Sequence, residues 1–421
     1  MRFKIRNSLA NFTIHRKIEK DWESKIMEWL LYFGCFFPFI QFVIYIGSDT
    51  QPTGLLVSVA IVLCYFLQKK VGMSARFGLL VSMVLLAGVL AVFGVMQVSL
   101  YDTLRAYFGY ISLFFIPVAT YLVLEARGGV NERLLKLITW IWFAVGFIQK
   151  YINSTFLHNI LSRAATNEAR GVVSLFSEPS AYGYMCLVML LFVMKFEKNK
   201  VLYMANLLIQ IVVFAQSSVT LVYLAAYIGM YMINELVYCK KHALFKAVVL
   251  FGGGIGSLLL IEKFARQGSR IQVLVHSLFN DPERLLNDGS ITLRVNAITY
   301  SIQEFVANYG MPHGMSQKIM SGIGTVLYEF GIFGIILVAI IAAIIWRGYE
   351  RGEGITYTFG FLVMMFSSIP FSAPVISFYL GWCLYCRKQR VMQHENASGE
   401  IIAVKGRNII RRKEYESSVD L

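Results

Sequence analysis

Residues 322–346 read GIGTVLYEFGIFGIILVAIIAAIIW, and this stretch indicates the class of the fold. Its 25 residues contain a single charged side chain, Glu329, and the apolar run is continuous rather than alternating. A helix needs about 20 mainly apolar residues to cross a bilayer, whereas a half-buried strand alternates apolar and polar positions. The stretch therefore predicts a membrane-spanning helix.

The whole chain shows the same excess of apolar residues. Of its 421 residues, 57% are hydrophobic and 15% are charged, whereas a soluble domain carries about a quarter charged residues. We therefore predict an all-α polytopic integral membrane protein with about 12 transmembrane helices, which excludes a soluble enzyme and a disordered scaffold. The candidate spans are 27–47, 54–67, 77–95, 106–124, 134–152, 179–194, 201–216, 217–237, 247–261, 322–346, 355–369 and 371–386.

The basic residues predict the orientation of these spans. The formal net charge is +14, and 15 of the 39 Lys and Arg residues lie in the two tails, 1–25 and 387–421. Together with the tails, the loops on one side of the spans carry 29 of the 39, although the longest loops lie on the other side. Because Lys and Arg accumulate on the cytoplasmic side, we expect both termini there. This distribution favours contact with the lipid bilayer and argues against nucleic acid as a partner.

The predicted organisation has three parts. A basic cytoplasmic tail, 1–26, precedes a transmembrane helical domain, 27–386, and a second basic cytoplasmic tail, 387–421, follows. The domain includes two long external loops, 150–178 and 262–321, and neither is rich in Gly and Ser. Long loops that are not linkers are usually functional. We therefore expect the chemistry of the protein in these two loops.

The first external loop leads from Arg170 into the sequence Phe-Ser-Glu-Pro-Ser at 176–180. Ser177 or Glu178 is a suitable N-cap for a helix whose first residue is Pro179. The free N–H groups at such a helix start attract an anion such as a phosphate. An ordinary helix cap with a solvated Arg170 fits the same residues, and local patterns do not separate the two interpretations.

The second external loop opens with Lys263, Arg266 and Arg270, at a spacing that suits one face of a helix. Further on, Asp288 is a candidate N-cap and Arg294 lies about one turn into the helix that would follow. The apolar residues there recur at helical spacing, at 295, 298, 302 and 305. The alternative to a functional Arg294 is an interfacial amphipathic helix that places this side chain among lipid headgroups.

Two further ionisable residues are candidates for function. His313 lies in a turn rich in Gly and Pro, 309–315, where it is either structural or a general base, since imidazole titrates near neutral pH. Glu329 lies inside a predicted span, where a charged group is costly without a partner, and we expect a buried pairing with an arginine. No His or Cys cluster has the spacing of metal ligands, so the sequence predicts neither a metal nor a cofactor.

Three motifs resemble those of the Wzy-type O-antigen polymerases, which polymerise oligosaccharide repeat units of bacterial surface polysaccharides. They are Arg170-Gly171 leading into Phe-Ser-Glu-Pro-Ser at 176–180, Asp-Gly-Ser at 288–290 with Arg294, and Leu-Tyr-Glu-Phe-Gly-Ile-Phe-Gly at 327–334. The resemblance also covers the architecture of many spans with two long periplasmic loops. It implies a multi-pass enzyme of the bacterial inner membrane with its active site on the periplasmic face.

The resemblance further implies a glycosyl transfer between undecaprenyl-diphosphate-linked glycans, with no metal. A growing chain leaves its diphosphate carrier and joins an incoming lipid-linked repeat unit; a chain-length regulator is a further expected partner. Arg170 and Arg294 would clamp the diphosphate, and Glu178 or His313 would be the base. The residues expected to bind substrate are Arg163, Ser180, Tyr182, Arg266, Arg270 and Glu329.

Two other functions remain open. An O-antigen ligase has the same architecture but transfers finished glycan to a lipid A-core acceptor. Ligases typically carry a histidine closely before the Gly-x-x-Gly span, and 317–330 contain none. A lipid-linked oligosaccharide flippase or another transporter should place charges within its spans, whereas this chain concentrates them in an external loop. The polymerase is therefore the favoured interpretation.

Overall fold

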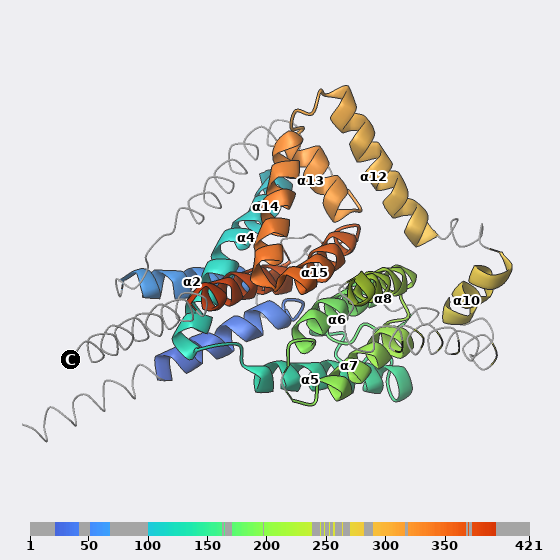
Figure 1. Ribbon diagram of the computed structural model, residues 1–421, viewed down its shortest axis with the longest axis horizontal. Coiled ribbons are helices and arrows are strands. Elements are labelled where there is room, and N and C mark those ends of the chain that lie inside the picture. Colours follow the sequence, from blue (N-terminus) through green and yellow to red (C-terminus); the bar gives the residue numbers. More distant parts are fainter. Residues whose placement is uncertain are drawn as a thin grey trace, which may run out of the picture.

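A computed structural model shows a helical protein (Figure 1). Across the described residues, the one pairing of β type is an isolated bridge between Ile40 and Leu161. The all-α class is therefore confirmed for this part of the chain. The residues that the structure describes are 22–41, 51–67, 100–161, 164, 171–196, 198–237, 245, 248, 252, 256, 263, 270–281, 289–315, 319–367, 369 and 373–392.

Several helices match a predicted apolar run to within a few residues, but the first predicted span, 27–47, is wrong in its extent because the helix ends at residue 36. A first helix covers 22–36 and a last helix covers 374–392, so the chain stays helical beyond the predicted start of the C-terminal tail at 387. Predicted spans 77–95 and 247–261 lie outside the continuously described segments, as do most residues of both tails. The remaining elements are α2 (Thr53–Leu67), α4 (Leu100–Arg127), α5 (Glu132–Tyr151), α6 (Pro179–Val193), α7 (Lys200–Ile209), the π-helix η1 (Gln210–Ala215), α8 (Ser218–Val237), α10 (Arg270–Asn280), α12 (Gly289–Ala307), α13 (Gly322–Phe330), α14 (Ile332–Gly348) and α15 (Arg351–Met364).

The stretch 322–346 is not one helix, which corrects the sequence-based prediction. It breaks at Gly331, whose φ of +56° and ψ of −130° separate α13 from α14. The N–H of Ile332 donates to the carbonyl of Gly310, and a Cβ at Gly331 would overlap that same carbonyl oxygen. The break exists because another segment of backbone packs directly against residue 331, and only glycine adopts this conformation without strain.

Two described helical segments are long and apolar enough to cross a bilayer, Ala106–Arg127 within α4 and Ser218–Val237. Four more are apolar but shorter: Thr53–Leu67, Pro179–Val193, Lys200–Ala215 and Ile332–Gly348. Buried core helices of soluble proteins also meet the length and composition test. The twelve-span topology is therefore not established by the described helices, and it remains a prediction.

The helix α6 lies at the centre of the protein. Its sequence, PSAYGYMCLVMLLFV, is apolar on nearly every side, and all of its residues except Ser180 are buried. A helix that is apolar all round needs neighbours on every side, and α6 contacts α7, η1 and α8. Ser180, at the start of α6, is thus the one residue of this helix that is only partly buried.

The second predicted external loop, 262–321, is largely helical where it is described. It contains α10 and α12, and α12 packs against α13 and also contacts α8. Figure 1 shows α12 along one edge of the protein, with its C-terminal end joined to α13. The predicted helix around Arg294 is therefore confirmed, and α12 connects the α8 side of the fold with the break at Gly331.

Candidate functional site

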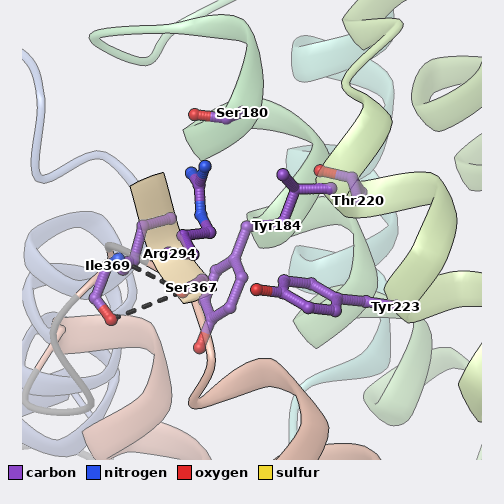
Figure 2. A pocket seen from close by; sticks show the side chains of 8 residues that line it. Ser180, Tyr184, Thr220, Tyr223, Arg294, Ser367 and Ile369 are labelled. Atoms are coloured by element: carbon purple, nitrogen blue, oxygen red, sulfur yellow. Dashed lines mark hydrogen bonds between the residues drawn. The ribbon is translucent and has the colours of Figure 1, made fainter. Parts of the chain in front are cut away.

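A cleft lies between the start of α6, α8, α12 and the turn that follows α15 (Figure 2). About 10 Å³ of the cleft is enclosed, roughly the space that one water molecule needs, and the total rises to about 190 Å³ when the open space at its mouth is included. The turn is held in place by α13, because the N–H groups of Gly322 and Ile323 donate to the carbonyls of Ser367 and Met365, at 2.7 and 2.8 Å. The lining residues are Ser180, Tyr184, Val219, Thr220, Tyr223, Arg294, Ser367 and Ile369.

Arg294 is the one charged residue among those that line the cleft. Its helix α12 brings it against α8, and Figure 2 shows its guanidinium pointing toward Ser180. Five of the other lining side chains carry hydroxyl groups, and those of Thr220 and Tyr223 come from α8. A planar guanidinium surrounded by hydroxyl donors is suited to bind an anion such as a phosphate group.

The start of α6 supplies the wall of the cleft opposite Arg294. Pro179 is the first residue of the helix, as predicted, and Glu178 occupies the N-cap in an extended conformation. The Glu178 side chain makes no capping hydrogen bond; instead, its Oε1 accepts a hydrogen bond from Ser180 Oγ. The predicted cap position is therefore correct, but the carboxylate is directed to the hydroxyl of Ser180.

Buried hydrogen bonds fix the segment before α6. Ser174, whose φ is +50°, donates from its N–H to Gln149 Oε1 at 2.6 Å and from its Oγ to the Trp142 carbonyl at 2.8 Å. Gln149 Nε2 returns a bond of 2.9 Å to the Ser174 carbonyl. A Cβ at Gly171 would overlap the carbonyl of Ala215. These contacts hold the entry to α6, and with it Glu178 and Ser180, against α5 and η1.

Tyr182 lies in the core and not among the residues that line the cleft. Its side chain is fully buried, and its hydroxyl donates a 2.8 Å hydrogen bond to Oε1 of Gln210 in η1. Gln210 is itself fully buried and donates to the carbonyl of Thr139 at 3.3 Å. The expected contact of Tyr182 with substrate stays untested, while its described contacts join α6 to η1 and α5.

His313 lies at the other end of α12 from the cleft. Its Nε2 is 3.3 Å from Oε2 of Glu304, and its ring stacks on Tyr328 with a centroid separation of 4.5 Å. Glu304 follows Arg294 by ten residues, which corresponds to about 15 Å along a helix. The structure therefore does not bring His313 and Arg294 together.

Glu329 is buried, as expected for an ionisable group in an apolar helix, but its partner differs from the prediction. Tyr110 on α4 donates its hydroxyl to Glu329 Oε2, and no described arginine pairs with this carboxyl group. Tyr110 also packs edge-on against Phe330, with ring centroids 4.6 Å apart. A neutral hydroxyl satisfies the carboxyl group without the desolvation of a second charge. Glu329 does not line the cleft.

Four of the predicted basic residues cannot be placed in the cleft. Arg163, Arg170 and Arg266 lie outside the described residues. Arg270 is the first residue of α10, and its side chain is not described. Their expected roles in binding a diphosphate stay predictions.

Sequence reasoning missed six residues of the cleft, of which four carry hydroxyl groups: Tyr184, Thr220, Tyr223 and Ser367. Tyr184 could have been predicted from the sequence, because it follows Ser180 by four residues and so lies on the same face of the helix. The α8 residues are brought to Ser180 by tertiary packing, in which Gly183 allows Thr220 to approach α6 closely. Nothing in the local pattern of α8 indicates that contact.

Comparison of the chain with family models, with curated proteins and with solved structures finds no match. Within the described part of the chain, His, Cys, Asp and Glu side chains do not gather in groups of three or more that would hold a metal ion. The function of this protein is therefore inferred from its sequence and from the geometry of the cleft.

Proposed function

We propose that this protein is a membrane glycosyltransferase that polymerises undecaprenyl-diphosphate-linked oligosaccharides, as the Wzy-type polymerases do. One observation carries the proposal: Arg294 lies in a cleft lined by hydroxyl groups, at the N-terminal end of the buried helix α6. The enzyme would be embedded in the bacterial inner membrane through about 12 spans, with this cleft on the periplasmic side.

The chemistry of the cleft supports a diphosphate leaving group. Departure of a glycan from its carrier leaves negative charge on a phosphate oxygen, and preorganised donors at that position are commonly the largest catalytic contribution. Arg294 offers a forked cationic donor, and the first turn of α6 offers N–H groups at the positive end of its dipole. Hydroxyl groups such as those of Thr220 and Tyr223 add neutral donors around the same space.

The apolar composition supports a membrane location. With 57% hydrophobic residues and a central helix buried on every side, the outer helices present apolar side chains outward, as Leu56, Phe66 and Val222 do. A substrate anchored by a polyprenyl chain requires an enzyme that meets the bilayer. A lipid tail would then lie beside the helices while its diphosphate enters the cleft.

The proposed transfer forms one glycosidic bond and breaks one sugar–phosphate bond. The acceptor hydroxyl of the incoming repeat unit attacks the anomeric carbon of the growing chain, and the diphosphate leaves with the bonding electron pair. Arg294 stabilises the leaving group, and we keep Arg170, Arg266 and Arg270 as supporting cations on the basis of the sequence. Neither a metal nor another cofactor is part of the proposal.

The test is a gel of surface polysaccharide from cells that lack the gene. If the protein is the polymerase, the long ladder disappears while lipid A-core with a single repeat unit remains. The full-length chain restores the ladder, Arg294→Ala does not, and a matched variant at an exposed arginine on α5, Arg133→Ala, restores it fully.

Two other outcomes would overturn the proposal. Accumulation of carrier-linked polymer with no glycan on the lipid A-core would identify an O-antigen ligase. Loss of all glycan beyond the core, with lipid-linked repeat units retained on the cytoplasmic side, would identify a flippase. Restoration of the ladder by Arg294→Ala would remove the cleft from the reaction.

A further inference from the structure

A hydrogen bond links the carboxylate of Glu178 to Ser180, a residue that lines the cleft. Ser180 Oγ donates to Glu178 Oε1, and Ser180 lines the cleft whereas Glu178 does not. The side chain of Glu178 makes no hydrogen bond to the N–H groups of α6, although the residue occupies the N-cap. The described partner of the carboxylate is therefore the hydroxyl that faces the cleft.

From this geometry we infer that Ser180 is a catalytic residue of the proposed transfer, which passes the proton of the acceptor hydroxyl to Glu178. The inference rests on the proposed function and adds a residue to it. Glu178 is then the base, as the sequence allowed, but it acts on the acceptor through Ser180.

The proton transfer balances in one step. The acceptor oxygen forms its bond to the anomeric carbon and releases its proton to Ser180 Oγ. Ser180 gives its own hydroxyl proton to the Glu178 carboxylate, and the electron pair of the broken sugar–phosphate bond leaves on the diphosphate beside Arg294. Glu178 then returns its proton to water, which restores the pair for the next transfer.

The positions of the groups favour this route over a direct one. A serine hydroxyl that donates to a carboxylate keeps lone pairs free to accept from a sugar hydroxyl, and the carboxylate polarises it so that it accepts more strongly. Figure 2 shows the Arg294 guanidinium pointing toward Ser180. The cation that would stabilise the leaving group and the hydroxyl that would accept the proton thus lie on either side of one space.

The competing base, His313, lacks this access. It contacts Glu304 and Tyr328 near the C-terminal end of α12 and is not among the residues that line the cleft. General acid–base catalysis requires the base to be within hydrogen-bonding reach of the proton, or one water away. The pair Glu178–Ser180 meets this requirement for a substrate in the cleft.

The experiment uses the full chain, purified and supplied with lipid-linked repeat units extracted from cells that lack the gene. Turnover and KM are measured for the wild type, Ser180→Ala, Ser180→Thr, Glu178→Gln and the double variant Ser180→Ala/Glu178→Gln. Ser177→Ala is the matched control, because Ser177 is a serine three residues before Ser180 and does not line the cleft. Binding of undecaprenyl diphosphate to each variant reports whether the cleft is intact.

The relay predicts a fall in turnover of about 100-fold or more for Ser180→Ala and for Glu178→Gln, with little change in KM. The double variant should be no slower than either single variant, since both changes interrupt one path. Ser180→Thr keeps the hydroxyl and should recover most of the rate.

A rate for Ser180→Ala close to that of the wild type, with undecaprenyl diphosphate still bound, would overturn the relay. So would effects that multiply in the double variant. These results differ from a failure of the proposed function itself, in which the wild-type chain forms no polymer from the same lipid-linked units.

Discussion

Both ends of α12 carry ionisable side chains, but the surroundings of these side chains differ. Near its start, Arg294 lines a cleft with the hydroxyl groups of two other helices. Near its end, Glu304 contacts His313, whose ring lies flat on Tyr328. At the first end a charged group borders a cleft that opens to solvent, whereas at the second the described ionisable groups contact each other.

The difference separates chemistry from anchoring. A catalytic group must be within reach of substrate, and the Arg294 end borders a cleft with an open mouth. The His313 end instead ties α12 to α13 and to the break at Gly331, because the N–H groups of His313 and Gly314 donate to the carbonyls of Tyr328 and Glu329, at 3.1 and 3.2 Å. Arg294 is positioned by a helix whose far end is held in this way.

The largest expected effect comes from Arg294→Lys, which keeps the charge in the cleft. Polymer formation by the purified chain should fall by about 100-fold or more, because the point charge of lysine cannot replace two parallel hydrogen bonds to a phosphate group. The measurement is the rate of ladder formation from lipid-linked units, with Arg133→Lys on α5 as the control. Polysaccharide of near-normal length from Arg294→Lys would contradict the role of Arg294 as a diphosphate clamp. Neither end of α12 would then have a catalytic role.

The next effect tests the anchored end through Gly331→Ala. The positive φ and the overlap of the new Cβ with the Gly310 carbonyl should lower the free energy of unfolding by about 3 kcal/mol. Thermal unfolding in detergent measures this change. The control is Gly229→Ala in α8, where a Cβ meets nothing within 4 Å and should not destabilise the chain. Equal unfolding temperatures for the two variants would show that the break is not needed.

A smaller effect is expected for His313→Gln. If His313 anchors α12, glutamine still donates to Glu304, and the loss of ring stacking on Tyr328 should cost about 1 kcal/mol of stability while turnover changes less than tenfold. Turnover and undecaprenyl diphosphate binding are measured together. A fall in turnover of about 100-fold with unchanged binding would make His313 the base and would reverse the distinction drawn between the ends of α12.

The smallest effect contrasts His313 with His158, which has no described hydrogen-bond partner for either ring nitrogen. Burial lowers the pKa of His158 from its ordinary value of 6.5. The folded state therefore favours the neutral ring, so its contribution to stability is present above that value and is lost as pH falls through it. The unfolding temperature of His158→Gln should decline less in acid than that of the wild type. Parallel declines would contradict this contribution.

Much of the helical framework could be predicted from local pattern. Pro179 at the first position of α6 and the continuous apolar run that follows it locate the central helix to within a residue of its observed end. The helix around Arg294 was equally visible from apolar spacing. These features depend on neighbours in the sequence, which a pattern records directly.

The break at Gly331 and the cleft depend on distant contacts, and local pattern could not reveal them. The apolar run 322–346 continues through Gly331 without interruption, and the packing of Gly310 against it identifies the break. Glu178 and Ser180 were both predicted site residues, but their hydrogen bond is a feature of the folded chain, and Ser180 and Arg294 share a cleft because α6 and α12 both contact α8. Tyr110 as partner of Glu329 likewise comes from a helix more than two hundred residues away.

The π-helix η1 makes the number of residues between α7 and α8 important for the fold. In η1 the N–H of Gln216 donates to Ile211, five residues earlier, so this segment holds more residues per turn than an α-helix. A π-turn holds one residue more than an α-turn, and such turns are found frequently at functional sites. Here it lets Gln210 reach Tyr182 while Ala215 still meets Gly171. Natural variants of this protein should therefore tolerate a change of apolar side chain in 211–214 far better than the deletion of one residue.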